Sequence, residues 1–375
     1  MHTVRRVFFV RVVVCVCAAL LVVPRAFGIY SKQDLNEIVG QLIVVSMGDG
    51  GLETTKRLLE EGRIGGVIIL REDVVSAENL RKITDEIHSV KSKHIPFIAA
   101  DMEGGLVAAL NATNGFAEFP SACEMAKKTP EEAREVYGKM ADLLADYHFN
   151  VNFAPCVDLA SRPDSIIAIK GRSYGSDAND VCKFARSFID AHSTNGIATC
   201  LKHFPGHGSV SGDTHNGFVD ATNSWMWAEL GPYRNLLSES DQSPAMMVMV
   251  SHVFNGNFDD KYPASLSRNS VEVLLRNGIG FGGVIISDSL TMLAIKNNFP
   301  LEETVVTSLN AGVDVLLFSN EKPFDSEIVN KIHGIIGRAL ADGRLDRRKL
   351  ERSFRRVVSL KKKIGGSRTP AAKAE

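Results

Sequence analysis

Short apolar runs recur along the chain and are separated by longer, mostly polar segments. Val, Ile, Leu and Phe fill these runs with little polar alternation, which is typical of strands buried on both faces of a sheet. We therefore expect every run to form a strand of one parallel sheet. The runs lie at 41–47, 65–70, 96–101, 150–158, 197–203, 245–252, 283–288 and 314–319.

The segments between the runs carry apolar residues three and four positions apart, which is the spacing of one helix face. Clear examples are 77–90, 131–148, 179–192 and 302–311. Strand and helix thus alternate over eight units, which predicts an α/β fold whose parallel sheet closes into a single (β/α)8 TIM-type barrel. No Pro- or Ser-rich linker divides the chain, so we expect one domain over residues 29–364.

The first 28 residues have the pattern of an export signal or an N-terminal anchor. Arg5 and Arg6 give a basic start, residues 12–23 are apolar, and Ala26-Phe27-Gly28 offers small residues at a cleavage point. Twelve apolar residues are too few to span a bilayer, but an uncleaved anchor results if the preceding apolar residues join the run. We expect an exported protein, periplasmic or extracellular, with or without such an anchor.

Charge and cysteine content narrow the function classes. Residues 1–28 hold four arginines and no acid, so the rest of the chain carries 39 basic and 44 acidic residues, a formal charge of −5 that argues against nucleic acid. Residues 361–363 are interpreted as a solvated, basic helix end, and residues 365–375 as a disordered tail. Cys156 and Cys200 lie in expected strands and are interpreted as buried apolar residues.

Polar residues follow several of the expected strands at the point where each strand ends. Because the carboxyl ends of parallel strands meet on one face of a barrel, we expect these side chains to share one pocket. An aspartate after a strand can instead cap the following helix, and for Asp101 and Asp288 this second interpretation stays open. The strand-end residues are Asp101, Glu103, Asp158, Lys202, His203, His252 and Asp288.

The densest polar stretch runs from Lys202 to Gly208 and continues with Asp213-Thr214-His215. A zinc site could use His203, His207 and His215, but their spacing is loose and Lys202 would repel a cation. A serine nucleophile is disfavoured as well, because the chain has no GxSxG turn.

Glycosyl transfer fits these residue types best, because it needs an anionic nucleophile and a proton donor flanking one sugar bond. Asp288 could serve as the nucleophile. His215 could serve as the donor, with Asp213 holding its ring and raising the basicity of the far nitrogen. On an extended segment, residues 213 and 215 would point to the same side. The sugar hydroxyls would then be bound by Lys202, His203 and Asp101.

The same stretch resembles a known signature. Lys-His-Phe-Pro-Gly-His-Gly at 202–208, followed by Asp-Thr-His at 213–215, is similar to the KHFPGHG and D-S/T-H pattern of family 3 glycoside hydrolases in the bacterial β-N-acetylhexosaminidase branch. Further matches follow in the same order between residues 39 and 312. They are Asp101-Met-Glu-Gly-Gly, Asn152-Phe-Ala-Pro, Gly171-Arg-Ser-Tyr, Pro263-Ala-Ser-Leu-Ser and Ser287-Asp-Ser-Leu-Thr-Met.

The resemblance implies a single (β/α)8 barrel and a retaining mechanism through a covalent glycosyl-enzyme, with no metal and no cofactor. Matched by motif, Asp288 is the nucleophile, His215 the acid/base and Asp213 its partner. His207 also matches a motif position, which we interpret as structural support for the loop. The contacts to the terminal N-acetylglucosamine are assigned by the resemblance to Asp101, Arg172, Lys202 and His203.

Two features depart from the family pattern. The family continues after DxEGG with R-V-x-R, whereas this chain has Leu106-Val-Ala-Ala109, so we expect altered sugar contacts on that side. Most relatives are also cytoplasmic, whereas this chain starts with an apparent export signal.

The sequence therefore predicts an exported, retaining exo-β-N-acetylglucosaminidase that acts on small peptidoglycan- or chitin-derived saccharides. Its expected partner is this substrate, with no nucleic acid and with membrane contact only through residues 1–28. A phosphorylase, in which phosphate resolves the intermediate, or another family 3 β-glycosidase would fit the same residues. From a different class, an inactive sugar-binding barrel is the remaining alternative, against which the presence of Asp288, Asp213 and His215 argues.

Overall fold

The computed structural model describes residues 32–48, 51–238, 245–319 and 325–366, so the predicted export signal lies outside the described residues. Eight parallel strands form one sheet in the order β11-β9-β7-β6-β3-β2-β1-β12. Each of these strands coincides with one of the apolar runs of the sequence, and only β7 extends past its run, by one residue at Phe204. They are β1 (Ile43–Ser46), β2 (Gly66–Ile68), β3 (Phe97–Ala100), β6 (Val151–Asn152), β7 (Ala198–Phe204), β9 (Met246–Val250), β11 (Val284–Ser287) and β12 (Leu316–Phe318).

The two end strands of this sheet meet and close the barrel. Val315, just before β12, donates its N–H to Ile285 O at 3.0 Å, and Ser287 N–H donates to Val315 O at 3.0 Å. An isolated parallel bridge joins Ile286 to the same residue. The predicted (β/α)8 barrel is thereby confirmed.

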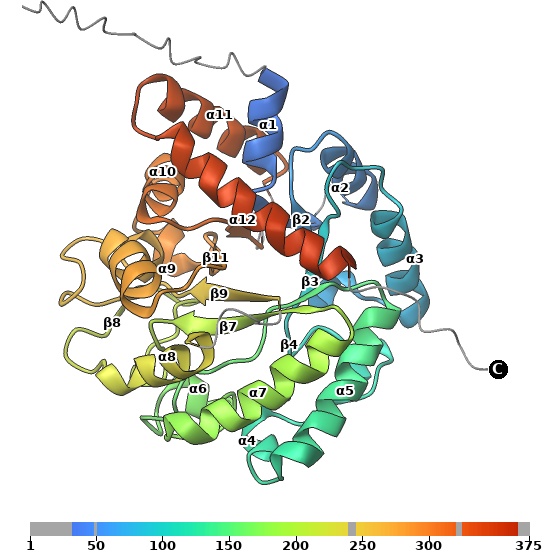
Figure 1. Cartoon of the computed structure of the whole chain (residues 1–375), viewed down its shortest axis with the longest axis vertical. Helices are drawn as coiled ribbons and strands as arrows, with labels where there is room; N and C mark the ends of the chain where they lie inside the picture. Colours follow the sequence, from blue (N-terminus) through green and yellow to red (C-terminus); the bar gives the residue numbers. More distant parts are fainter. Residues whose placement is uncertain (1–31, 49–50, 239–244, 320–324, 367–375) are drawn as a thin grey trace, which may run out of the picture.

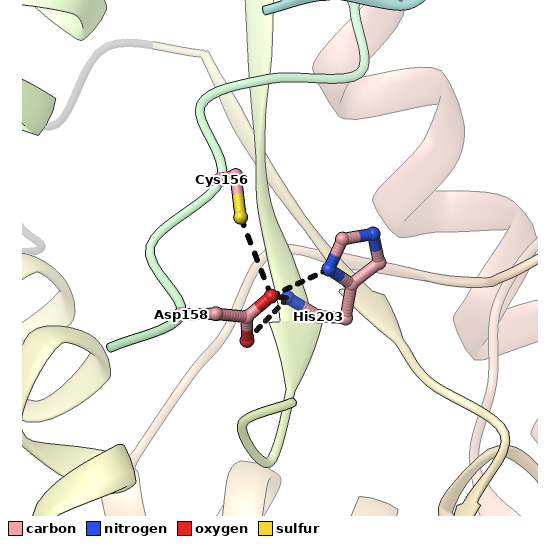
Figure 2. Close-up of side chains that lie close together, drawn as sticks. All are labelled: Cys156, Asp158 and His203. Carbon is pink, nitrogen blue, oxygen red and sulfur yellow. Dashed lines mark hydrogen bonds and ion pairs between the residues drawn. The ribbon is translucent and has the colours of Figure 1, made fainter. Parts of the chain in front are cut away.

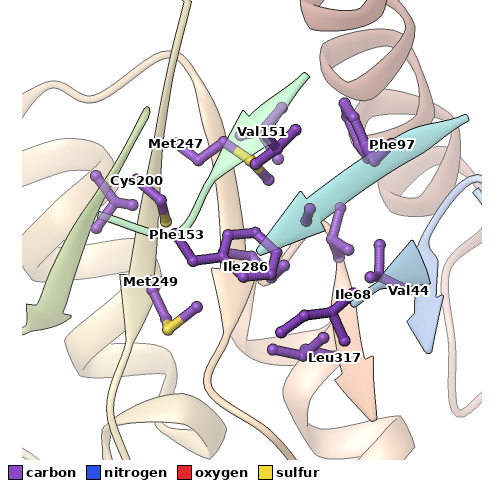
Figure 3. Packing of buried hydrophobic residues seen from close by; sticks show 14 of the residues in the cluster. Val44, Ile68, Phe97, Val151, Phe153, Cys200, Met247, Met249, Ile286 and Leu317 are labelled. Carbon is purple, nitrogen blue, oxygen red and sulfur yellow. The ribbon is translucent and has the colours of Figure 1, made fainter. Parts of the chain in front are cut away.

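The barrel interior is filled by apolar side chains from every strand of the sheet. Cys200 is fully buried among them, as the sequence predicts. Truncating such a residue, for example Ile286 to alanine, would cost about 2–5 kcal/mol through lost burial and the cavity left behind. Figure 3 shows part of this core, in which Val44, Ile68, Phe97, Val151, Phe153, Cys200, Met247, Met249, Ile286 and Leu317 are labelled.

Helices surround the strands, and α5 and α7 lie side by side on the outside (Figure 1). Thr129 caps α5 through the Glu132 N–H, with Pro130 in the first turn, and Asp177 caps α7. No helix among the described residues has the length and apolar character needed to cross a membrane. The helices are α1 (Lys32–Gly40), α2 (Gly51–Glu60), α3 (Ala77–His88), α4 (Ala122–Met125), α5 (Pro130–Asp146), α6 (Ile166–Ile169), α7 (Ala178–Thr194), α8 (Gly231–Leu237), α9 (Leu293–Lys296), α10 (Leu301–Ala311), α11 (Ile328–Ala341), α12 (Arg347–Gly366) and the π-type segment η7 (Asn269–Ile279).

Two small sheets extend from the carboxyl ends of the barrel strands. One is the antiparallel pair β4 (Met102–Gly104) and β5 (Val107–Ala108), which follows β3. The other, which we call the satellite sheet, pairs β8 (Val219–Asp220) with β10 (Val253–Phe254). A separate small core lies beneath the satellite sheet and consists of Val210, Val219, Ala221 and Val253, with Trp225 packed against it.

The end of α12 corrects one interpretation of the sequence. Lys361, expected in a solvated helix end, is only 2% exposed and donates to Gln41 Oε1 and to Gly65 O, both at 2.6 Å. Burial lowers the pKa of Lys361 to about 7. Because its two partners precede β1 and β2, this lysine ties the last helix to the amino-terminal end of the barrel.

Candidate active site

A cavity of about 260 Å³ opens at the carboxyl ends of the barrel strands. Strand-end apolar residues, including Ile68, Met249 and Leu317, form part of its wall. The structure brings six of the seven predicted site residues to this one cavity, and the seventh, Asp213, lies behind His215. The six are Asp101, Arg172, Lys202, His203, His215 and Asp288.

Asp288 follows β11 directly and is held by one hydrogen bond of its backbone and one of its side chain. Its N–H donates to Val250 O at 2.9 Å, and its Oδ1 accepts the Ser289 N–H at 2.8 Å. Burial would raise the pKa of Asp288, but the neighbouring histidines 252, 203 and 215, when protonated, and the Ser289 N–H lower it to about 2. Asp288 is therefore a carboxylate at neutral pH.

His252 supports the segment that carries Asp288. Its Nε2 donates to the carbonyl oxygen of Ser289 at 2.7 Å, and its Nδ1 lies 2.7 Å from Ser265 Oγ. The ring is completely buried. The sequence marked His252 as a strand-end residue without giving it a role, and the structure shows it bracing the residue next to Asp288.

Glu103 joins two cations that line the cavity, Arg172 and Lys202. It accepts from Arg172 through Nε at 2.9 Å and Nη2 at 2.6 Å, and Lys202 Nζ lies 2.7 Å from its Oε1. Although burial alone would raise it, these two cations hold the pKa of Glu103 well below its usual range. The sequence indicates no role for Glu103 beyond its place after a strand, although the residue stands in the Asp101-Met-Glu motif.

Lys202 also donates to Asp101 Oδ1 at 2.5 Å. Burial lowers the pKa of this lysine, but Asp101 and Glu103 outweigh the burial and raise it above its usual value. An ammonium has three donors, and these two contacts occupy two of them. Because Lys202 lines the cavity, its third donor can serve a ligand hydroxyl, and the Asp101 side chain, 35% exposed, can accept from one.

Asp158 fixes the orientation of His203 (Figure 2). His203 Nδ1 lies 2.6 Å from Asp158 Oδ2, and Arg172 Nη2 lies 3.1 Å from His203 Nε2. A guanidinium can only donate, so Nε2 accepts and the ring proton sits on Nδ1, facing Asp158. Burial would raise the pKa of Asp158, but His203, His207 and the backbone N–H of His203 lower it to about 2.

The structure brings together three residues of the kinds that bind metals, but they are not the three histidines considered as a zinc site from the sequence. Among the described residues, ligand atoms of Cys156, Asp158 and His203 lie within 4.8 Å of one another. Cys156 Sγ lies 3.3 Å from Asp158 Oδ2, and Arg172 occupies the far nitrogen of the imidazole. The cluster is thus a hydrogen-bonded support beside a guanidinium, which would repel a cation.

Asp213 and His215 form the expected pair, but on a turn rather than on an extended segment. His215 Nδ1 lies 2.7 Å from Asp213 Oδ1, and the same oxygen accepts the His215 N–H at 3.0 Å. This second bond closes an Asx-type turn, which corrects the predicted extended geometry. Burial raises the pKa of Asp213, but His215 lowers it overall, and Lys170 Nζ, 3.6 Å from Asp213 Oδ2, acts in the same direction.

The loop between β7 and this turn rests on Glu229. A side chain at Gly206, which has φ +121°, would place its Cβ 2.4 Å from Glu229 Cβ, so only glycine fits there. Glu229 Oε2 accepts the Leu159 N–H at 3.4 Å, and Ser161 Oγ lies 3.3 Å from Oε1. Burial and the nearby Asp158 raise the pKa of Glu229 to about 8.

His207 lies in the same loop. Its side chain is buried, and its N–H donates to Asp158 Oδ1 at 2.8 Å. This placement agrees with the interpretation of His207 as structural support for the loop.

Residues 106–109, which stand where the family that the sequence resembles has two arginines, face the cavity through Val107. Ala109 is 5% exposed and donates its N–H to Asp101 O at 2.9 Å, so this position points into the core, and Val107 lines the cavity instead. Arg71 donates to the backbone carbonyls of Leu106, at 2.8 Å, and Ala108, at 3.1 Å. An arginine therefore does touch this segment, from the loop after β2.

Known proteins are similar to this chain over most of its length. The family model described as the glycosyl hydrolase family 3 N terminal domain matches residues 34–360. The β-hexosaminidase LpqI of Mycobacterium tuberculosis is 33% identical over 346 residues, which cover 89% of this chain and 84% of the relative. The β-hexosaminidase of Tolumonas auensis is 33% identical over 275 residues, covering 71% and 79% of the two chains.

Comparison with solved structures finds similar proteins. The structure of M. tuberculosis LpqI matches with a TM-score of 0.76 at 29% identity, covering 88% of this chain and 94% of that chain. A glycoside hydrolase family 3 β-N-acetylglucosaminidase from Paenibacillus sp. matches with a TM-score of 0.77 at 28% identity. That match covers 88% of this chain but only 62% of the Paenibacillus protein, which is longer.

Proposed function

Because this chain belongs to glycosyl hydrolase family 3, we propose that it is an exo-acting β-N-acetylglucosaminidase that retains the configuration of the sugar it releases. One observation carries the mechanism. The carboxylate of Asp288 and the imidazole of His215 line the same cavity from two different elements, with Asp213 behind the imidazole. An anionic nucleophile and a proton donor around one bond are what retaining hydrolysis requires.

In the first step, Asp288 attacks the anomeric carbon. Its Oδ1 accepts the Ser289 N–H, so we assign the attack to Oδ2. A bond forms between Oδ2 and the anomeric carbon while the glycosidic bond breaks, and the leaving oxygen takes the proton from Nε2 of protonated His215. The product is a glycosyl ester of Asp288 together with the free leaving-group alcohol.

In the second step, the now neutral His215 accepts a proton from water through Nε2. The water oxygen bonds to the anomeric carbon, and the ester bond to Asp288 breaks, which restores the carboxylate. Asp213 holds Nδ1 at 2.7 Å throughout, so Nε2 stays directed at the reacting oxygen. The acceptor of this step is what separates a hydrolase from a phosphorylase.

A second group of residues that line the cavity supplies the sugar contacts. Lys202 has one donor left after pairing with Asp101 and Glu103, and Asp101 is partly exposed. We assign the hydroxyl contacts of the terminal N-acetylglucosamine to these two residues, and further contacts to the adjoining Arg172 and His203. Small peptidoglycan- or chitin-derived saccharides are the proposed substrates.

The test is an assay with an aryl β-N-acetylglucosaminide and the matching β-glucoside, followed by product analysis with and without phosphate. The proposal expects release from the N-acetylglucosaminide, free N-acetylglucosamine as product, and initial retention of the β-configuration. Sugar 1-phosphate formed only with phosphate would make the protein a phosphorylase. Binding of N-acetylglucosamine without turnover would make it an inactive sugar-binding barrel.

Export remains a separate proposal, supported by the basic start and apolar run of residues 1–28. Fractionation of cells that produce the full chain, with N-terminal sequencing of the mature protein, tests it. A protein found in the cytoplasm with Met1 intact would contradict export.

A further inference from the structure

Exposed aromatic side chains gather on the satellite sheet and the loops beside it. Trp227 is 62% exposed and Phe218 is 46% exposed, and among the described residues these are the only aromatic side chains open to solvent to this degree. Such a patch on an otherwise polar surface marks a binding site more often than chance. We call the set of Phe218, Trp225, Trp227, Phe254 and Phe258 the aromatic surface.

The rings of the aromatic surface form two contacting groups. Trp225 lies edge-on to Trp227, with centroids 5.2 Å apart, and to Phe258 at 4.8 Å. Phe218 lies 5.2 Å from Phe254 on the paired strand. These contacts hold the partly buried rings in fixed orientations, so the exposed Trp227 is presented by a rigid support.

The aromatic surface is continuous with the loop that carries the dyad. Val210 and Val219 flank His215 in sequence, and both belong to the small core under the satellite sheet. Trp225 packs on this core and donates its Nε1–H to Pro205 O at 3.3 Å, in the loop that follows β7. The small core under the satellite sheet therefore supports both the aromatic surface and the segment that carries His215.

The proposed chemistry indicates which part of the saccharide lies on the His215 side. The acid protonates the leaving oxygen, so the leaving part of the saccharide lies on the His215 side of the broken bond. The cavity, about 260 Å³, is slightly smaller than the roughly 300–1,000 Å³ of ligand pockets, so further sugar units of the leaving group lie outside it. The chain enters β8 of the satellite sheet at Val219, four residues after His215, so we place this sheet on the leaving-group side.

The composition of the surface suits a saccharide. A pyranose ring presents apolar C–H groups on its faces and hydroxyls at its edges, so it binds best to an aromatic ring bordered by polar groups. Asp220, Thr222 and Asn257 border the rings and are joined by hydrogen bonds, Thr222 Oγ1 to Asp220 Oδ1 at 2.5 Å and Asn257 Nδ2 to Thr222 O at 2.9 Å.

We propose that the aromatic surface binds the leaving-group end of longer β-linked saccharides, with one sugar stacked on the indole of Trp227. This inference rests on the proposed function, because it uses His215 to define the leaving side. The enzyme then favours saccharides of several units over disaccharides, although it releases only the terminal sugar.

The test compares chain-length dependence in wild type, Trp227→Ala, Trp227→Phe and the control Val273→Ala, which changes an exposed apolar residue on η7. kcat/KM is measured on N-acetylglucosamine oligomers of increasing length and on an aryl N-acetylglucosaminide. We expect Trp227→Ala to lower the ratio of long-oligomer to aryl kcat/KM by about tenfold, mainly through KM. Trp227→Phe should lower this ratio less than Trp227→Ala does, and Val273→Ala should leave it at the wild-type value.

An unchanged ratio in Trp227→Ala would overturn the proposal. The proposal would also be overturned if light scattering shows a dimer for wild type and a monomer for Trp227→Ala while the ratio of kcat/KM values stays the same. The aromatic surface would then be a contact between copies of the chain. Calorimetry of a long oligomer with Asp288→Asn, with and without Trp227→Ala, tests binding independently of turnover. If the wild type is inactive on every substrate, the proposed function fails, but weaker oligomer binding in the double variant still supports the surface and equal binding overturns it.

Discussion

Asp158 Oδ2 lies 2.6 Å from Nδ1 of His203, and the same carboxylate accepts the backbone N–H of His203 at 3.1 Å and of His207 at 2.8 Å. One buried carboxylate thus keeps the His203 ring proton on Nδ1 and also holds the backbone from His203 to His207. Because Arg172 donates to the other nitrogen of His203, the imidazole links Asp158 to the pair of Arg172 and Glu103. Two residues that line the cavity, Arg172 and His203, are thus held in place by carboxylates outside its lining.

Replacing Asp158 by asparagine tests this organisation. The variant keeps the shape but removes the charge that accepts three N–H groups, and a hydrogen bond to a charged group is worth about 1.5–3 kcal/mol. We expect kcat/KM on an aryl N-acetylglucosaminide to fall by about 10- to 100-fold. Asp164→Asn, at an exposed aspartate paired with Arg162, is the control. A folded Asp158→Asn protein with wild-type kcat/KM would contradict this role.

His215→Ala separates acid catalysis from sugar binding. Protonation matters most for a poor leaving group such as a sugar alcohol, and little for an activated phenol. Loss of a general acid typically costs ~10²–10⁴ in rate, so we expect a loss of this size on a disaccharide and a much smaller loss in glycosylation by an aryl glycoside. Rapid-quench kinetics on both substrates measure the difference.

The same variant should accumulate the glycosyl-enzyme, because His215 also activates the water. Azide needs no base, so adding it should speed turnover and yield a β-glycosyl azide. Asp213→Ala should show a milder form of both effects, since the imidazole remains but loses its partner at 2.7 Å. Equal losses on both substrates, with no azide product, would place the proton donor elsewhere.

Glu229 predicts a pH dependence of stability. Its pKa is about 8 in the folded protein and about 4.3 when unfolded, so between these values the unfolded chain releases a proton that the folded protein keeps. Glu229 therefore favours folding less as pH rises through this window, and its effect is constant above it. Glu229→Gln, which stays neutral, should gain stability relative to wild type between pH 5 and pH 8.

Urea unfolding of wild type and Glu229→Gln at both pH values measures this gain, with Glu135→Gln on the exposed side of α5 as the control. A stability difference that is the same at pH 5 and pH 8 would show that Glu229 is ionised in the folded protein. Retained activity in Glu229→Gln is also expected, because the account has the carboxyl neutral at pH 7.

Much of this architecture is readable from the sequence because it depends on local patterns. The apolar runs identify all eight barrel strands, since strands buried on both faces need continuous apolar character. Strand ends converge on one face in any such barrel, which is why Asp101, Lys202 and Asp288, far apart in sequence, could be placed together.

The remaining features depend on contacts between distant residues. Glu103 meets Arg172 across 69 positions, and Lys361 meets Gln41 across 320, and no local pattern indicates either contact. Position 109 is adjacent to a site motif, but its direction depends on how β4 and β5 fold back, so the residue types alone do not show that Ala109 is buried. The turn at Asp213 is closed by a hydrogen bond from the His215 N–H to the Asp213 side chain, which residue types alone do not fix.

The central claim is that Asp288 carries the covalent intermediate, and trapping that intermediate tests it most directly. A 2-deoxy-2-fluoro glycoside with a good leaving group slows both steps but hydrolysis more, so the ester should accumulate. Digestion and mass spectrometry should then find one sugar on the peptide that contains Asp288, and Asp288→Ala should lose nearly all turnover while remaining folded. A sugar attached to any other residue, or inactivation without a covalent adduct, would contradict the account.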